Sequence, residues 1–178
     1  VDQEPHLEVA REIARKMNNQ YDMDFAEPQR FKTSGDYVPS LTGEGKMSKS
    51  VEGSFISLTD DLETIRKKIS KVQTATISGG EMSDGVKLLF NFIDLFVSND
   101  SHAKEYKNMF MNGTLKFSDL KEYVSQIIFA ELMPIQKRRK ELELKPEYVE
   151  EVLKKGATKA RQIAQQTINE VKQKMGLM

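Results

Sequence analysis

The sequence predicts a mostly α-helical protein in which a short region of mixed α/β character precedes a helical bundle. Two observations support this prediction. Apolar residues recur at helical spacing through most of the second half of the chain, whereas glycine and proline interrupt residues 21–53. The chain has 178 residues, of which 38% are hydrophobic and 30% charged, so it is long enough to bury a core.

The first expected element is an amphipathic helix over about residues 5–19. Pro5 suits the first turn of a helix, and apolar residues follow it at spacings of three and four. The two prolines and four glycines of residues 21–53 then separate short apolar pieces. We expect loops there, with one or two short strands.

The next two helices are predicted at about 59–72 and 86–97. Thr59 is the expected N-cap of the first, because acidic residues follow it and lysines lie near the end. The second is apolar on nearly every face, which predicts a central buried helix.

Three further helices are expected towards the C-terminus. One covers about residues 103–112 and ends at Gly113, since glycine readily adopts the left-handed conformation that closes a helix. The next begins with Ser118 as its cap and continues past Pro134 to about residue 142, with a kink at the proline.

The last predicted helix starts at Pro146 and ends at Gly176. It carries a sustained seam of apolar and small residues, which is typical of a helix that packs against a partner. Within this seam, Gly156 and Ala160 predict a close helix–helix contact.

Composition excludes several classes of protein. The absence of cysteine excludes disulfides, thiolate metal sites and a cysteine nucleophile, and only two histidines are present. We therefore expect no protein-held metal site. The chain carries 27 basic and 27 acidic residues, and no apolar run approaches the length of a membrane span. We expect a cytoplasmic protein that does not enter a membrane.

The segment Lys46-Met47-Ser48-Lys49-Ser50 is the strongest candidate for chemistry. Two ammonium groups lie three residues apart beside hydroxyls, and Gly43 and Gly45 precede them. Such a loop can hold a polyanion and stabilise the negative charge that grows on a departing pyrophosphate. By composition alone, an ordinary solvated lysine loop explains the same residues.

This segment resembles the KMSKS signature of class I aminoacyl-tRNA synthetases. Upstream, Asp2-Gln3-Glu4-Pro5-His6-Leu7-Glu8 resembles a helix-opening motif of tryptophanyl-tRNA synthetases. Downstream, the segments 134–142, 146–153 and 159–164 are similar to the C-terminal helices of the bacterial members. Three matches in the right order cover nearly the whole chain, which makes the resemblance specific.

The resemblance implies the C-terminal part of a class I Rossmann-like nucleotide-binding domain, followed by a helical anticodon-binding domain. The implied boundaries are 1–58 for the first part, 59–80 for a connecting helix and linker, and 81–178 for the helical domain. The sequence begins at Val1 and lacks the family's H-I-G-H motif. We therefore expect a chain that starts inside a domain and cannot form an adenylate by itself.

The implied activity is ATP-dependent activation of tryptophan, followed by transfer to tRNA(Trp). Lys46, Ser48 and Lys49 are the implied catalytic residues, which bind the ATP phosphates together with Mg²⁺ carried by those phosphates. Asp2 and Gln3 match the pair that contacts the ribose and the reaction centre. Val38 and Met47 match an adenine-flanking position. The family also implies a homodimer.

Positive charge gathers near the C-terminus. Residues 137–178 carry 11 basic and 6 acidic side chains, a net charge of about +5, which suits an approach to phosphates. The resemblance implies that this region helps recognise tRNA, with Lys154, Lys159 and Arg161 as candidate contacts.

Two alternatives remain open. A tyrosyl-tRNA synthetase shares the fold, although its signature loop usually departs from a full Lys-Met-Ser-Lys-Ser. A non-catalytic helical module that binds RNA or protein would make the lysine pair incidental.

Overall fold

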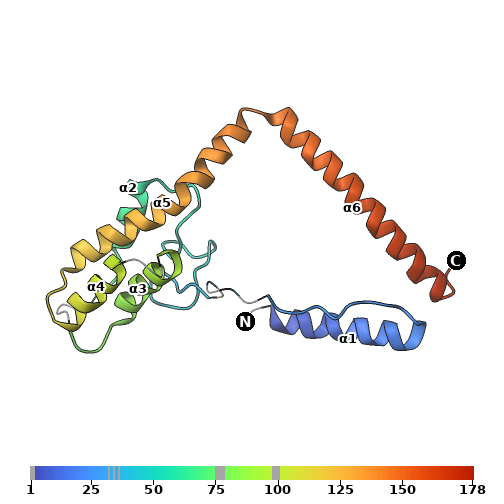
Figure 1. Ribbon diagram of the computed structural model, residues 1–178, viewed down its shortest axis with the longest axis horizontal. Coiled ribbons are helices and arrows are strands. Elements are labelled where there is room, and N and C mark those ends of the chain that lie inside the picture. The colour runs from blue at the N-terminus through green and yellow to red at the C-terminus, as the bar shows by residue number, and fades with distance from the viewer. Residues whose placement is uncertain (1–2, 32, 34, 36, 75–78, 98–100) are drawn as a thin grey trace. The chain divides into compact units, whose positions relative to one another are not determined.

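The computed structural model contains six α-helices among the residues it describes, which are 3–31, 33, 35, 37–74, 79–97 and 101–178 (Figure 1). In chain order the helices are α1 (Glu4–Tyr21), α2 (Leu62–Ser70), α3 (Asp84–Phe96), α4 (Ser101–Met111), α5 (Phe117–Glu143) and α6 (Pro146–Lys174). The mostly helical prediction is confirmed. No helix in the described part of the chain is long and apolar enough to cross a membrane.

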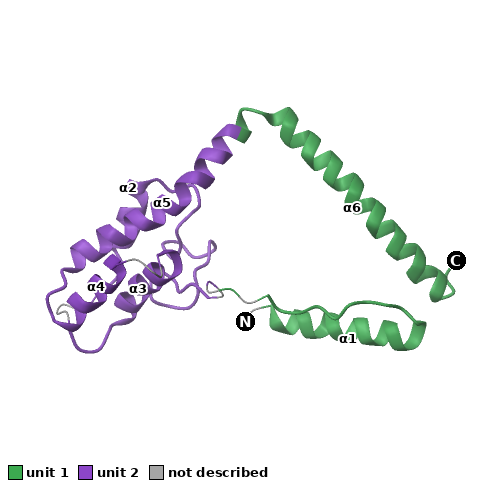
Figure 2. Ribbon diagram, in the orientation of Figure 1, with its two compact units in different colours: residues 1–33, 142–178 green, residues 34–141 purple. Residues whose placement is uncertain are grey.

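The chain divides into two compact units, which Figure 2 distinguishes by colour. Unit 1 comprises residues 1–33 and 142–178, and unit 2 comprises residues 34–141. The functional boundaries at residues 58 and 80 that the family resemblance implies stay a prediction.

Unit 2 contains the main hydrophobic core, and α3 lies at its centre. Six residues of α3 are buried, and Val86, Leu89 and Ile93 have no exposed surface. Ile65 and Ile69 of α2 and Leu120 and Val124 of α5 belong to the same core and are equally buried. The near-continuous apolar sequence of α3 thus reflects contacts on several of its faces, as expected.

Gly85 allows α3 to begin directly against the chain that leaves α2. A Cβ atom at this position would lie 1.8 Å from the carbonyl oxygen of Gln73. Only a residue without a side chain permits this backbone approach.

Two predicted helix caps are wrong. Asp61, not Thr59, caps α2, because its carboxylate accepts a 2.8 Å hydrogen bond from the Thr64 N–H. Ser118 already lies inside α5, and its hydroxyl donates to the Asp119 carboxylate instead of capping the helix. Gly113 does close α4 in the left-handed region, with φ of 71°, and α5 does continue past Pro134.

The expected short strands are also wrong for the described residues of 21–53. A single antiparallel bridge joins Pro39 and Lys46, and it extends into no strand. The pairing is closed on one side by the turn between Ser40 and Gly45, where Gly43 and Gly45 have positive φ angles, and this turn limits its length.

Unit 1 consists mainly of α1 and α6. Ala14 is the buried residue of α1, whereas Val9 and Ile13 are more than half exposed. No described residue of α6 is buried, and a Cβ at Gly156 would meet nothing within 4 Å. The close helix contact predicted at Gly156 is therefore wrong, since the seam is exposed in this chain. Inside unit 1, Lys174 donates to the carbonyl of Asp22.

Candidate functional site

The candidate site is the loop of residues 38–54, which we call the lysine loop. Its two arms are joined by hydrogen bonds from Met47 N–H to the Val38 carbonyl at 2.8 Å and from Ser40 N–H to the Gly45 carbonyl at 3.0 Å. Gly43 and Gly45 adopt positive φ angles of 84° and 68°, a backbone conformation that residues with a side chain rarely adopt. The glycines thus allow a tight reversal immediately before Lys46.

Ser54 fixes the second half of the lysine loop. Its side chain is buried, and its hydroxyl donates to the Ser48 carbonyl at 2.5 Å while accepting a 3.3 Å hydrogen bond from the Ser48 N–H. The Ser54 carbonyl accepts a further bond from the Leu41 N–H at 3.0 Å. One buried serine therefore holds Ser48 by both of its backbone groups. Sequence reasoning did not identify Ser54, because a lone serine after Gly53 carries no periodic signal.

Several apolar side chains of the lysine loop pack against the core of unit 2, although Val51 is 53% exposed, and both lysines of the loop are exposed. Val38 and Met47 are partly buried and pack against this core. Lys46 and Lys49 are both exposed on the same loop. Because the backbone between them is held by the Ser54 hydroxyl, the two ammonium groups are presented from one fixed turn. The Ser48 hydroxyl accepts a 3.3 Å bond from the Ser50 N–H, which leaves its own proton to donate.

A cleft of about 610 Å³ borders the start of the lysine loop within unit 2. Thr42, Gly43 and Glu44 line it from the loop, and Lys68 and Lys71 line it from α2 and the residue that follows. Lys68 already has partners within the protein, because it forms a 2.5 Å ion pair with Asp60 and lies over the Phe55 ring. We therefore assign no ligand to this cleft.

The other predicted nucleotide contacts lie at the start of the chain. Gln3 is the exposed N-cap residue of α1, and its carbonyl accepts a bond from the Leu7 N–H at 3.0 Å. Asp2 lies outside the described residues. Gln3 belongs to unit 1, whereas the lysine loop belongs to unit 2.

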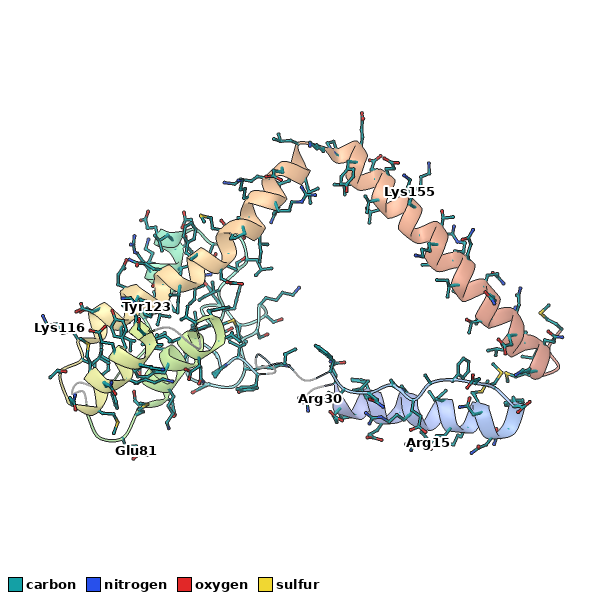
Figure 3. All side chains as sticks on the ribbon, in the orientation of Figure 1. Arg15, Arg30, Glu81, Lys116, Tyr123 and Lys155 are labelled. Carbon is teal, nitrogen blue, oxygen red and sulfur yellow. The ribbon has the colours of Figure 1, made fainter. Side chains whose placement is uncertain are left out.

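The predicted tRNA contacts lie on α6. Lys154, Lys159 and Arg161 are all exposed, and Figure 3 shows side chains standing out on every side of this helix, Lys155 among them. Lys155 is paired with Glu151 at 2.5 Å. Exposure permits contact with phosphates but does not distinguish these three residues from other solvated lysines and arginines.

The described residues contain no cluster of three or more histidine, aspartate or glutamate side chains that could hold a metal ion. The lysine loop offers ammonium and hydroxyl groups, which suit phosphate oxygens rather than a cation. This donor set fits a nucleotide whose Mg²⁺ is held by its own phosphates.

Comparison with known proteins gives consistent results. The family model described as tRNA synthetases class I (W and Y) matches residues 1–133. The chain is 36% identical to the tryptophan–tRNA ligase of Porphyromonas gingivalis over 98% of its own length and 55% of that protein. It is 33% identical to the tryptophan–tRNA ligase of Lactococcus lactis over 99% of its length and 54% of that protein. The chain thus spans about half the length of the curated relatives it matches.

Solved structures are similar as well. The tryptophanyl-tRNA synthetase of Campylobacter jejuni matches with a TM-score of 0.72 at 30% identity, over 98% of this chain and 55% of that one. The synthetase of Mycoplasma pneumoniae matches with a TM-score of 0.80 over 99% of this chain and 54% of that one, at 22% identity. At that identity the second likeness concerns the fold alone.

Proposed function

This chain belongs to the family of class I tRNA synthetases for tryptophan and tyrosine, and from that premise we propose that it is the C-terminal part of a tryptophan–tRNA ligase. In the complete enzyme, ATP would activate tryptophan to the adenylate, and the tryptophanyl group would then pass to tRNA(Trp). The identities of 36% and 33% to tryptophan–tRNA ligases support tryptophan over tyrosine as the amino acid.

The observation that carries the proposal is the geometry of the lysine loop. Glycines at positive φ and the Ser54 hydroxyl hold one turn, and that turn presents Lys46, Ser48 and Lys49. In the reaction, the carboxylate of tryptophan attacks the α-phosphorus, and the bond to the departing pyrophosphate breaks. The two ammonium groups would stabilise the charge that grows on the pyrophosphate, while the Ser48 hydroxyl donates to a phosphate oxygen.

Further contacts to the nucleotide follow from the family. Asp2 and Gln3 would contact the ribose and the reaction centre, and Val38 and Met47 would flank the adenine. Bound Mg²⁺ would neutralise phosphate charge. A phosphate-bound ion needs no dedicated protein ligands. The main contribution of this chain to phosphate binding is therefore the lysine loop with its two ammonium groups.

The remaining partners are proposed on charge and family. Lys154, Lys159 and Arg161 on α6 would contact tRNA phosphates, with an affinity that falls as salt rises. The complete enzyme would be a cytoplasmic homodimer, as the family implies. No specific observation on this chain favours the tyrosyl enzyme or a non-catalytic module.

The test is amino-acid-dependent ATP–pyrophosphate exchange by a hybrid, in which this chain is joined to the unmatched part of the Porphyromonas gingivalis relative. We expect exchange that depends on tryptophan and not on tyrosine. A tyrosine-dependent reaction would assign the chain to the other amino acid of the family. A folded hybrid that exchanges with neither amino acid would contradict the proposal.

A further inference from the structure

A short turn, residues 57–60, connects the lysine loop to α2. The Ser57 N–H donates to the Asp60 carboxylate at 2.8 Å, and the Asp60 N–H donates to the Ser57 carbonyl at 3.1 Å. The turn follows Ser54 by only three residues, so a short backbone connection joins it to the lysine loop. How this turn is held therefore contributes to the position of the lysine loop.

The helix α2 holds the turn through one lysine. Lys68 forms a 2.5 Å ion pair with Asp60 and lies 4.9 Å from the centre of the Phe55 ring. Both partners are largely buried for charged residues, with 24% of the Lys68 side chain and 12% of the Asp60 side chain exposed. This contact fixes the acidic side chain of the turn but leaves the turn's carbonyl groups to other donors.

The helix α5 holds the turn through Gln136. Its side-chain amide nitrogen donates to the Leu58 carbonyl at 3.0 Å and to the Asp60 carbonyl at 2.9 Å, although these residues lie 78 and 76 positions away in sequence. Gln136 is half-buried, whereas Ile135 and Lys137 beside it are exposed. An amide NH₂ group has the two protons that two carbonyls require.

We propose that Gln136 is a positioning residue that anchors the lysine loop to α5. It acts through the turn: two hydrogen bonds fix the backbone of residues 58–60, and this backbone leads directly to Ser54 and the lysines. The inference rests on the proposed function only in taking the loop as the part that contacts ATP. Gln136 itself touches no substrate in this account.

The test is amide hydrogen exchange on this chain, without any ligand, in three variants. Gln136→Met keeps the length and removes both donors, and Gln136→Glu keeps the shape but presents carboxylate oxygens to two carbonyls. The control is Gln126→Met, because Gln126 lies on the same helix and bonds only Glu122 among the contacts described for it. We expect exchange of the Ser57, Asp60 and Leu41 amides to accelerate roughly tenfold in both Gln136 variants.

A stability-matched comparison separates anchoring from general stability. Losing two hydrogen bonds also lowers the free energy of global unfolding, so α3 amides that exchange by global unfolding accelerate too. Ile93→Val removes one buried methyl group from α3 and destabilises the core without changing a group that bonds to the turn. This variant should leave the Ser57, Asp60 and Leu41 amides, which exchange by local opening, at the wild-type rate.

Loop exchange that stays at the wild-type rate in Gln136→Met, or in Gln136→Glu, overturns the inference. Equal acceleration of these loop amides in Ile93→Val and in Gln136→Met also overturns it, since that result means a purely structural role. Because no nucleotide is present, neither result bears on the proposed catalytic function.

Discussion

At the scale of single residues, Ser54 is the uncharged side chain that holds the backbone of the lysine loop. Its buried hydroxyl meets both backbone groups of Ser48. Removing it leaves the part-buried Ser48 N–H without that partner and the Ser48 carbonyl with the 3.2 Å bond from the Val51 N–H. An unmade buried hydrogen bond costs about 1–3 kcal/mol, which is enough to open a short loop far more often.

We therefore expect Ser54→Ala to speed tryptic cleavage after Lys46 and Lys49 by roughly tenfold, because cleavage requires local opening. Ser50→Ala is the matched control. The Ser50 side chain is exposed, and the hydrogen bond that Ser50 makes within the loop comes from its backbone N–H, which alanine keeps. Limited proteolysis followed by mass spectrometry measures both rates. Equal cleavage of the two variants would show that Ser54 does not hold the loop.

Asp61 gives a pH-dependent prediction. Hydrogen bonds from Thr64 hold the pKa of the Asp61 carboxyl below its ordinary value of 3.8. A lowered pKa in the folded state means that the cap stabilises above this value and is lost as the pH falls through the folded pKa. The Asp61→Asn variant would keep an amide oxygen to cap the helix but would not titrate.

Between about pH 5 and pH 3, the thermal midpoint of the wild type should therefore fall further than that of Asp61→Asn. Thermal unfolding followed by circular dichroism checks this. Parallel curves for the two proteins at all pH values would mean that the carboxylate contributes nothing as a cap.

At the scale of elements, α3 and α6 both carry apolar residues at helical spacing but differ in what they contribute to stability. Leu89 of α3 is fully buried, whereas Leu153 of α6 is 66% exposed. We expect Leu89→Ala to lower the free energy of unfolding by about 2–5 kcal/mol and Leu153→Ala by less than about 0.5 kcal/mol. Denaturant titration of both variants measures the difference, and comparable losses would contradict the assignment of the core to unit 2.

The sequence predicted the helices well and their contacts less well. Periodic apolar residues located all six helices of the described chain, because that signal is local. The N-cap of α2 was misplaced by two residues, since Thr59 and Asp61 are both good caps and only the fold decides between them. The exposed seam of α6 and the close approach at Gly85 depend on neighbours that no local pattern reveals.

The same distinction applies to the site. The lysine pair and the glycines before it were visible in the sequence, because charge and backbone freedom belong to the residues themselves. Ser54, Lys68 and Gln136 were not, because each acts through a hydrogen bond or ion pair with a specific partner. In particular, Gln136 reaches a turn 76 residues earlier in the chain, and no spacing rule predicts that contact.

At the scale of the whole molecule, we propose that the chain provides one part of an adenylate-forming site. It spans about 55% of the Porphyromonas gingivalis relative, and the family's H-I-G-H motif is absent from its sequence. We expect the chain alone to show no tryptophan-dependent ATP–pyrophosphate exchange, because preorganisation requires both sides of the nucleotide site. Turnover by the chain at the rate of the hybrid enzyme would contradict this expectation.

The most direct test of the account is the effect of the loop lysines on that exchange. In the hybrid enzyme, Lys46→Ala and Lys49→Ala should each slow tryptophan-dependent exchange by roughly 100-fold or more, since each removes charge that stabilises the departing pyrophosphate. Lys104→Ala, on the exposed surface of α4, should leave the rate within about twofold. Rates for both loop variants that equal the Lys104→Ala rate would contradict the assignment of this loop to ATP.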